Sequence, residues 1–145
     1  LHRQVNDTVS AGARCVLGGE LPSGPGFNYP VTLLTNVTES MCGAREETFG
    51  PVAVVMKAED EADAIRIANN TPYGLAAAVW SDAKRGEAIA AQLETGQVAV
   101  NGIVKTDPRL PSGGIKRSGM GRELGPHGIR EFVNAKQVWV GPKQG

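Results

Sequence analysis

Residues 52–80 read VAVVMKAEDEADAIRIANNTPYGLAAAVW, and this stretch decides the fold class. It opens with the apolar run Val52–Met56, which predicts a strand. Asp60 is a suitable N-cap for a helix, and Pro72 ends the helical pattern. The apolar run Leu75–Trp80 predicts the next strand. Strand, helix and strand in this order indicate an α/β fold.

The alternation continues on the C-terminal side of this stretch. Ser81 or Asp82 can cap a second helix, and Gly96 stops it. Gln97–Asn101 is then the third predicted strand. Short connections through helices predict a parallel sheet with right-handed crossovers. Because the strands are almost unbroken apolar runs, we expect both faces of that sheet to be covered.

The flanking segments add further predicted elements. We expect helices over residues 1–11 and 129–134, and strands over residues 13–17, 31–37 and 137–140.

A glycine-rich loop, residues 102–126, follows the strand that ends at Asn101. Active sites of parallel sheets lie at the carboxyl ends of strands, and loops of this length are usually functional. Its cluster Gly113–Glu123 matches neither the P-loop nor the dinucleotide-binding pattern. The cluster therefore predicts unusual backbone angles, with Arg122 and Glu123 holding the loop by hydrogen bonds.

The segment Glu46–Val52, EETFGPV, places two carboxylates just before an aromatic ring and a Gly-Pro turn. An ionised carboxylate such as Glu47 can accept hydrogen bonds from both hydroxyls of a ribose. The ring of Phe49 could cover a flat group beside it. The alternative is that the two acids are only solvated or act like an N-cap, and that Phe49 belongs to the core.

Composition excludes several classes of protein. Lys+Arg and Asp+Glu are both 15, so the net charge of zero argues against a nucleic-acid partner. No apolar run is long enough for a membrane helix. The two cysteines and two histidines form no metal-binding spacing, and sparse cysteine usage fits the cytoplasm. The chain begins at Leu1, inside an apparent helix, so we expect a piece of a longer protein.

The cysteines and the basic residues of the loop have ordinary interpretations. Cys15 is expected to be buried and inert in a strand, and Cys42 to lie on a loop without a group that lowers its pKa. The basic side chains of the loop form either a solvated face or a docking site for an anionic substrate. They are Lys105, Arg109, Lys116 and Arg117.

Together these segments resemble the aldehyde dehydrogenase family over essentially the whole chain. Within that family they are most similar to bacterial succinate-semialdehyde dehydrogenases. The segments that carry the resemblance are Glu46–Val52, Ala68–Leu75, Val100-Asn101, Gly113–Glu123 and Gly128–Asn134.

The resemblance implies a fold and an assembly. Residues 1–126 would belong to the parallel-sheet C-terminal portion of the family's catalytic domain. Residues 127–145 would form a C-terminal helix and an oligomerisation strand, which implies a homo-oligomer.

The resemblance also implies roles for matched residues. Glu47 would bind the nicotinamide ribose of NAD or NADP, and Phe49 would pack near the nicotinamide. Glu123 lies where some members place a proton-relay carboxylate. Ser112 stands where the family usually has a phenylalanine of the aldehyde pocket. The residues that would contact the substrate are Asn101, Lys105, Thr106, Arg109 and Ser112.

The implied activity is the NAD(P)-dependent oxidation of an aldehyde, succinate semialdehyde, to its carboxylate. Lys105 or Arg109 would receive the distal carboxylate of that substrate. The family's nucleophilic cysteine, general base and Rossmann half precede this segment, so the chain alone is expected to be inactive. Two alternatives remain: an aldehyde dehydrogenase for another substrate, and a non-catalytic assembly module.

Overall fold

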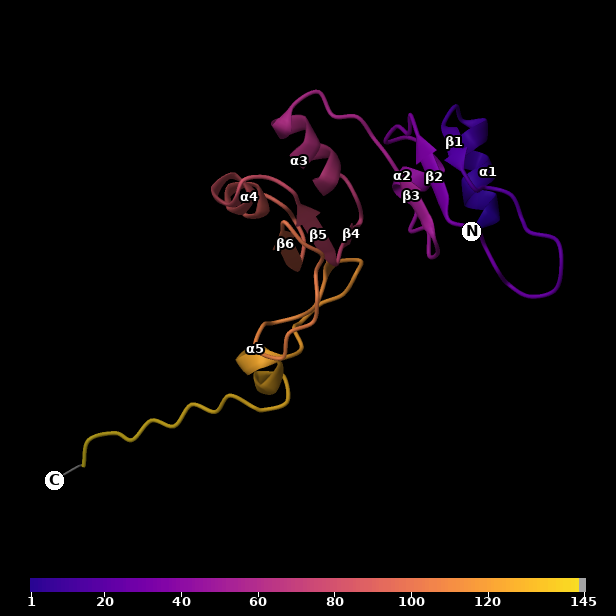
Figure 1. The fold of residues 1–145 in the computed structure, drawn as a ribbon. Coiled ribbons are helices and arrows are strands. Elements are labelled where there is room, and N and C mark those ends of the chain that lie inside the picture. The colour runs from indigo at the N-terminus through magenta and orange to yellow at the C-terminus, as the bar shows by residue number, and fades with distance from the viewer. Residues whose placement is uncertain (144–145) are drawn as a thin grey trace. The chain divides into compact units, whose positions relative to one another are not determined.

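The computed structural model describes residues 1–143, which fold as two compact units, one ending at Thr71 and the other beginning at Pro72 (Figure 1). The helices are α1 (His2–Ser10), α2 (Cys42–Arg45), α3 (Glu61–Asn69), α4 (Ala83–Ala90) and α5 (Gly125–Arg130). The strands are β1 (Arg14–Leu17), β2 (Thr32–Thr35), β3 (Val52–Val54), β4 (Tyr73–Gly74), β5 (Ala76–Val79), β6 (Gln97–Val100) and β7 (Ile115–Lys116).

The first unit is built on a three-stranded mixed sheet in the order β1-β2-β3. β1 and β2 are antiparallel, whereas β2 and β3 are parallel, with Leu34 opposite Val54. A parallel pair needs a crossover connection, and the connection from β2 to β3 contains α2. The central strand β2 alternates between buried and half-buried residues, and Leu34 is completely buried.

The core of the first unit is small. Its buried apolar residues are Val5, Ala13, Leu34, Val37 and Met41. Two buried threonines accompany them, and the hydroxyl of Thr8 accepts a hydrogen bond from the Gly43 backbone N–H at 2.9 Å. Helix α1 is thereby fixed against α2 through both apolar and polar contacts.

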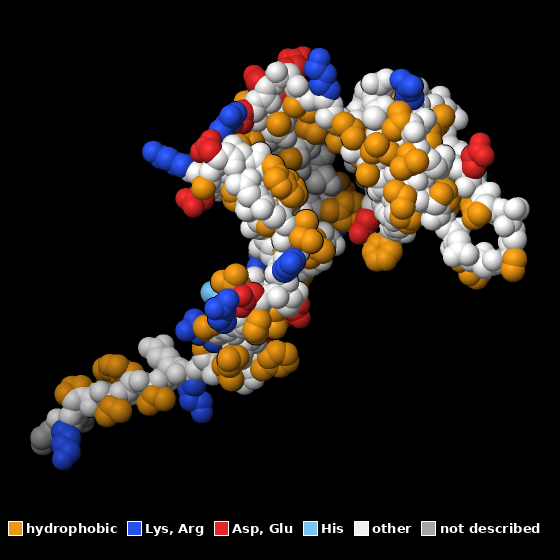
Figure 2. Space-filling model, in the orientation of Figure 1, with side chains coloured by type: hydrophobic (Ala, Val, Ile, Leu, Met, Phe, Trp, Pro, Cys, Tyr) orange, Lys and Arg blue, Asp and Glu red, His pale blue; other side chains and the backbone are white. Residues whose placement is uncertain are grey.

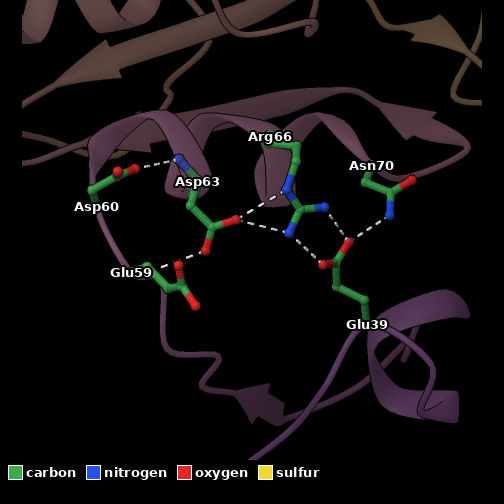
Figure 3. Close-up of polar contacts among 6 residues, drawn as sticks. All are labelled: Glu39, Glu59, Asp60, Asp63, Arg66 and Asn70. Atoms are coloured by element: carbon green, nitrogen blue, oxygen red, sulfur yellow. Dashed lines mark hydrogen bonds and ion pairs between the residues drawn. The ribbon is translucent and has the colours of Figure 1, made fainter.

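Helix α3 is held in the first unit by polar contacts (Figure 3). Asp60 caps the helix as predicted, because its carboxylate accepts a hydrogen bond from the Asp63 N–H at 2.8 Å. Arg66 donates to Asp63 on its own helix and forms a two-pronged ion pair with Glu39, at 2.6 and 3.0 Å. Asn70 donates to the same Glu39 carboxylate. No residue of α3 is fully buried, and the Glu39 carboxylate ties the helix to the rest of the unit.

The second unit contains two pairs of strands. β5 and β6 are parallel, with Val79 opposite Val100, and α4 connects them and packs on both. Asp82 caps α4 by accepting a hydrogen bond from the Arg85 N–H, which confirms one of the two caps considered. β4 and β7 are antiparallel, with Gly74 opposite Ile115.

The prediction of one parallel sheet with covered faces is wrong for the described residues. β3 pairs with β2, while β5 and β6 form a separate sheet. Ala53, Ala76 and Ala78 stay exposed on the strands. Apolar periodicity identifies the strands, but it does not say which strands pair.

Two C-terminal predictions also change. The predicted helix over 129–134 forms earlier, as α5, because Pro126 suits a first helical turn. Residues 137–140 have no strand assignment, since no described segment pairs with them. Their apolar side chains are exposed, as the C-terminal segment in Figure 2 shows.

The prediction for Cys42 is also wrong, because Cys42 begins α2 instead of lying on a loop.

The glycine cluster behaves as predicted. Gly113, Gly119 and Gly121 all have positive φ angles. Arg122 holds the loop through its guanidinium, which donates to the Gly114 and Gly121 carbonyls at 2.9 and 2.6 Å. Glu123 contributes through its backbone, which exchanges two hydrogen bonds of 2.8 Å with Ser112.

Within residues 1–143, no helix combines the length and apolarity that crossing a bilayer requires. The same residues contain no group of three metal-ligating side chains close enough to hold an ion.

Candidate functional site

The loop between α2 and β3 carries the first candidate site. Glu47 is exposed, and its carboxylate makes no hydrogen bond or ion pair within the described residues. The ring of Phe49 is 88% exposed. The alternative that Phe49 belongs to the core is therefore wrong. An unengaged carboxylate and an uncovered ring two residues apart can bind a polar, flat ligand.

The two adjacent glutamates have different surroundings. The Glu46 carboxylate pairs with the Arg3 guanidinium at 2.9 Å and accepts a hydrogen bond from the Gln4 amide at 3.0 Å. These donors, Gln4 first, lower the pKa of Glu46 below its ordinary value. Because Glu46 is engaged by α1, Glu47 is the member of the pair that is free to accept hydrogen bonds from a ligand.

The second unit contains a cavity of about 630 Å³ beside β6 and the loop that follows it. Three of the residues predicted to contact a substrate line this cavity: Lys105, Thr106 and Ser112. Lys105 is exposed and forms no ion pair in the described part of the chain. Apolar residues such as Ile103 and Leu110 complete the wall. The cavity can therefore accept a small, partly apolar molecule with an anionic end.

Two other predicted substrate residues do not line the cavity. The Asn101 amide is used twice by Ser81, accepting from its N–H at 3.0 Å and donating to its carbonyl at 2.7 Å. Arg109 forms two hydrogen bonds with the Asp107 carboxylate, at 2.9 and 2.6 Å. That pairing holds the pKa of Asp107 below its ordinary value. Both side chains are committed to the structure of the loop.

Glu123 lies in a second, smaller cavity of about 400 Å³, which the glycine cluster lines together with Ser112 and Phe132. The side chain of Glu123 is exposed. Ser112 lines both cavities, because its backbone bridge to Glu123 joins the two segments.

Neither cysteine has the surroundings of a nucleophile. Burial, and then the neighbouring Glu46 carboxylate, raise the pKa of the Cys42 thiol. Cys15 lies in a strand, β1, as predicted, but it is half-buried instead of buried, and its thiol donates to the Leu17 and Gly18 carbonyls. A thiol with a raised pKa is a poor source of thiolate.

No sequence motif singles out Arg3 and Gln4. They approach the candidate loop from a helix more than forty positions away. Their partner, Glu46, lies next to the predicted Glu47, and this adjacency is the sequence feature that could have drawn attention to the contact.

Comparison with known proteins places these features in context. The model of the aldehyde dehydrogenase family matches residues 1–138. A probable NADP(+)-dependent succinate-semialdehyde dehydrogenase of Synechocystis is 48% identical over 138 residues, covering 94% of this chain and 30% of that protein. The chain thus spans about 30% of the length of this curated relative.

Solved structures agree with the family match. The structure of Gox0499, studied for its cofactor and substrate selection, has a TM-score of 0.91 and 46% identity, covering 97% of this chain and 31% of that one. The succinic semialdehyde dehydrogenase of Streptococcus pyogenes, solved with NADP+, has a TM-score of 0.90 and 36% identity, covering 96% and 31%.

Proposed function

The chain belongs to the aldehyde dehydrogenase family, and on this premise we propose that it is the part of an NAD(P)-dependent aldehyde dehydrogenase that holds the nicotinamide and receives the aldehyde. The observation that carries the proposal is the contrast between Glu46, engaged by α1, and Glu47, exposed and unengaged. Because the chain spans only about 30% of its curated relative, the activity is that of a longer protein.

Glu47 and Phe49 are the proposed cofactor-binding residues of the first unit. The Glu47 carboxylate would accept hydrogen bonds from the two hydroxyls of the nicotinamide ribose. Phe49 would cover one face of the ring, since 88% of its surface is open. When bound, NAD or NADP would accept the hydride that the aldehyde loses. The residues of this chain bind and orient the two reactants.

We propose succinate semialdehyde as the substrate. The relative from Synechocystis and the structure from Streptococcus pyogenes both carry that name, and the cavity beside β6 offers a cationic side chain. Lys105 is the better candidate for the distal carboxylate. It lines the cavity, whereas Arg109 is neutralised by Asp107.

The substrate assignment predicts different effects for the two basic residues. In the full-length enzyme, Lys105→Ala is expected to reduce the preference for succinate semialdehyde over an uncharged aldehyde of similar size by about tenfold or more, as loss of a charge-assisted contact would. Arg109→Ala is the matched control and leaves that preference nearly unchanged. Equal preferences in wild type and Lys105→Ala would exclude Lys105 as the carboxylate ligand.

Replacement of Glu47 tests the cofactor role. In the full-length enzyme, Glu47→Gln is expected to slow hydride transfer more than it weakens cofactor binding, because misplaced reactants lose rate steeply. Stopped-flow absorbance of the reduced nicotinamide measures the first quantity, and equilibrium titration the second. Glu20→Gln, at an exposed carboxylate on a loop of the same unit, is the control. Unchanged hydride transfer in Glu47→Gln would falsify the role.

We also propose that the chain alone is catalytically inactive, that it acts in the cytoplasm and that it assembles as a homo-oligomer. The first point rests on the two thiols, of which neither has an activating neighbour. Aldehyde-dependent production of NAD(P)H by the 145-residue chain would contradict it.

A further inference from the structure

Helix α1 presents two hydrogen-bond donors to the loop that carries Glu47. Arg3 donates to Asp7 at 2.6 Å and to Glu46 at 2.9 Å. Gln4 donates to the Glu46 carboxylate at 3.0 Å and to the Glu47 backbone carbonyl at 3.1 Å. The peptide of Glu47 is therefore held by α1 while its carboxylate stays unengaged.

The frame behind these contacts is held by hydrogen bonds of a buried threonine. The hydroxyl of Thr8, which is completely buried, donates to the Gln4 carbonyl at 2.6 Å and accepts from the Gly43 N–H at 2.9 Å. Gly43 lies in α2, the helix that ends just before Glu46. At the other end of the loop, the side chain of Leu1 fills the space where a Cβ on Gly50 would stand. Helix α1 and the preceding Leu1 thus contact the loop on both sides of Glu47.

The guanidinium of Arg3 would attract any neighbouring carboxylate. Glu46 and Glu47 are adjacent and chemically identical, so both are possible partners. In the structure Arg3 pairs with Glu46 and Asp7, and no cation within residues 1–143 pairs with Glu47. Glu46 therefore occupies the donors that would otherwise compete with a ribose for Glu47.

We propose that Glu46 is a positioning residue, which keeps Arg3 away from Glu47 and so leaves the Glu47 carboxylate available to the nicotinamide ribose. This inference rests on the proposed function of Glu47 and names what keeps that side chain free. Removing the charge of Glu46 frees Arg3 to pair with Glu47. Removing Arg3 as well should then restore the free carboxylate.

The first experiment uses the 145-residue chain. NMR titration of the Glu47 carboxyl in Glu46→Gln is expected to give a lower pKa than in wild type, because Arg3 now pairs with it. The Arg3→Gln/Glu46→Gln double variant returns that pKa to the wild-type value. Glu46→Asp keeps the charge and leaves it unchanged. A Glu47 pKa that is the same in wild type and Glu46→Gln overturns the proposal.

The second experiment uses the full-length enzyme. Glu46→Gln is expected to slow hydride transfer by roughly tenfold, with rescue in the Arg3→Gln/Glu46→Gln variant. A structural role alone would predict a further loss in the double variant, not a rescue. If Glu47→Gln leaves hydride transfer unchanged, the proposed function fails, and the NMR titration still decides whether Glu46 keeps Arg3 from Glu47.

Discussion

At the scale of single residues, side chains of the same charge make different contacts because their neighbours differ. Glu46 is bound by Arg3 and Gln4, whereas Glu47, one position later, is unengaged. Similarly, Lys105 faces the cavity of the second unit, and Arg109 is held by Asp107. The charge of a side chain alone therefore does not tell which member of either pair is engaged within the described residues.

The side chain of Asn101 forms its hydrogen bonds with backbone groups. Its φ angle is +54°, and its amide bonds to both backbone groups of Ser81. Asn101→Ala is expected to lower the free energy of unfolding by about 2 kcal/mol, from two lost hydrogen bonds and a strained backbone. Asn101→Gly loses the same bonds without the strain, so it should cost less. Urea unfolding measures both, and equal losses would contradict the contribution of strain.

Two glycines of the second unit form a matched pair. A Cβ on Gly96 would lie 1.8 Å from the Gly113 carbonyl oxygen, whereas a Cβ on Gly102 would meet nothing within 4 Å. Gly96→Ala should therefore destabilise the chain by about 3 kcal/mol, since backbone must move to make room. Gly102→Ala should be neutral or slightly stabilising. Thermal unfolding of the two variants checks this, and similar melting temperatures would contradict it.

At the scale of elements, the predicted segments form largely where expected, and tertiary contacts decide how each is held. Helix α3 shows this clearly. Its N-cap, Asp60, is a local signal that the sequence carries. Its attachment to the unit depends on Glu39, which lies 27 positions before Arg66 and has no recognisable motif.

The contacts of α3 predict a pH dependence. Hydrogen bonds from Arg66 and then Asn70 lower the pKa of Glu39, and bonds from the Glu59 N–H and then Arg66 lower that of Asp63. Carboxyls with lowered pKa values stabilise the folded state fully above their ordinary pKa of about 4. That contribution is lost as the pH falls through the lowered values. Backbone chemical shifts of α3 should therefore lose helical character in acid.

A substitution separates this effect from general acid unfolding. Arg66→Met is expected to return the pKa of Glu39 toward its ordinary value, because its main donor is gone. Lys84→Met, at an exposed basic residue of α4, should leave that pKa unchanged. If Arg66→Met also leaves it unchanged, the ion pair does not hold the helix.

At the scale of the whole molecule, much apolar surface is uncovered. The core of the first unit contains five buried apolar residues, and several apolar side chains of the C-terminal segment are exposed. Val138 is 77% exposed, Trp139 78% and Val140 85%. An unpaired extended segment of this kind is a template for pairing with another chain.

This surface predicts association of the chain in solution. The 145-residue chain is expected to sediment as an oligomer, because pairing of residues 137–140 removes apolar surface from water. Trp139→Lys should shift the population toward the monomer. Leu21→Lys, at a residue 59% exposed on a loop of the first unit, is the control and should not. A monomeric wild-type chain in sedimentation velocity would contradict the expected homo-oligomer.

The sequence by itself determined the approximate positions of most of the helices and strands, the residue at which helix α3 begins, and the unusual backbone angles of the glycine cluster. These features depend on residues that are close in sequence: the spacing of apolar residues, the capping side chain of a helix, and glycine, which has no side chain. Only the tertiary structure decided that β3 pairs with β2, that Asn101 serves the backbone and that Glu47 is free while Glu46 is not. The partner of Asn101 lies 20 positions away in the chain, and Arg3, the partner of Glu46, lies 43 positions away. A local sequence pattern does not specify contacts between residues so far apart.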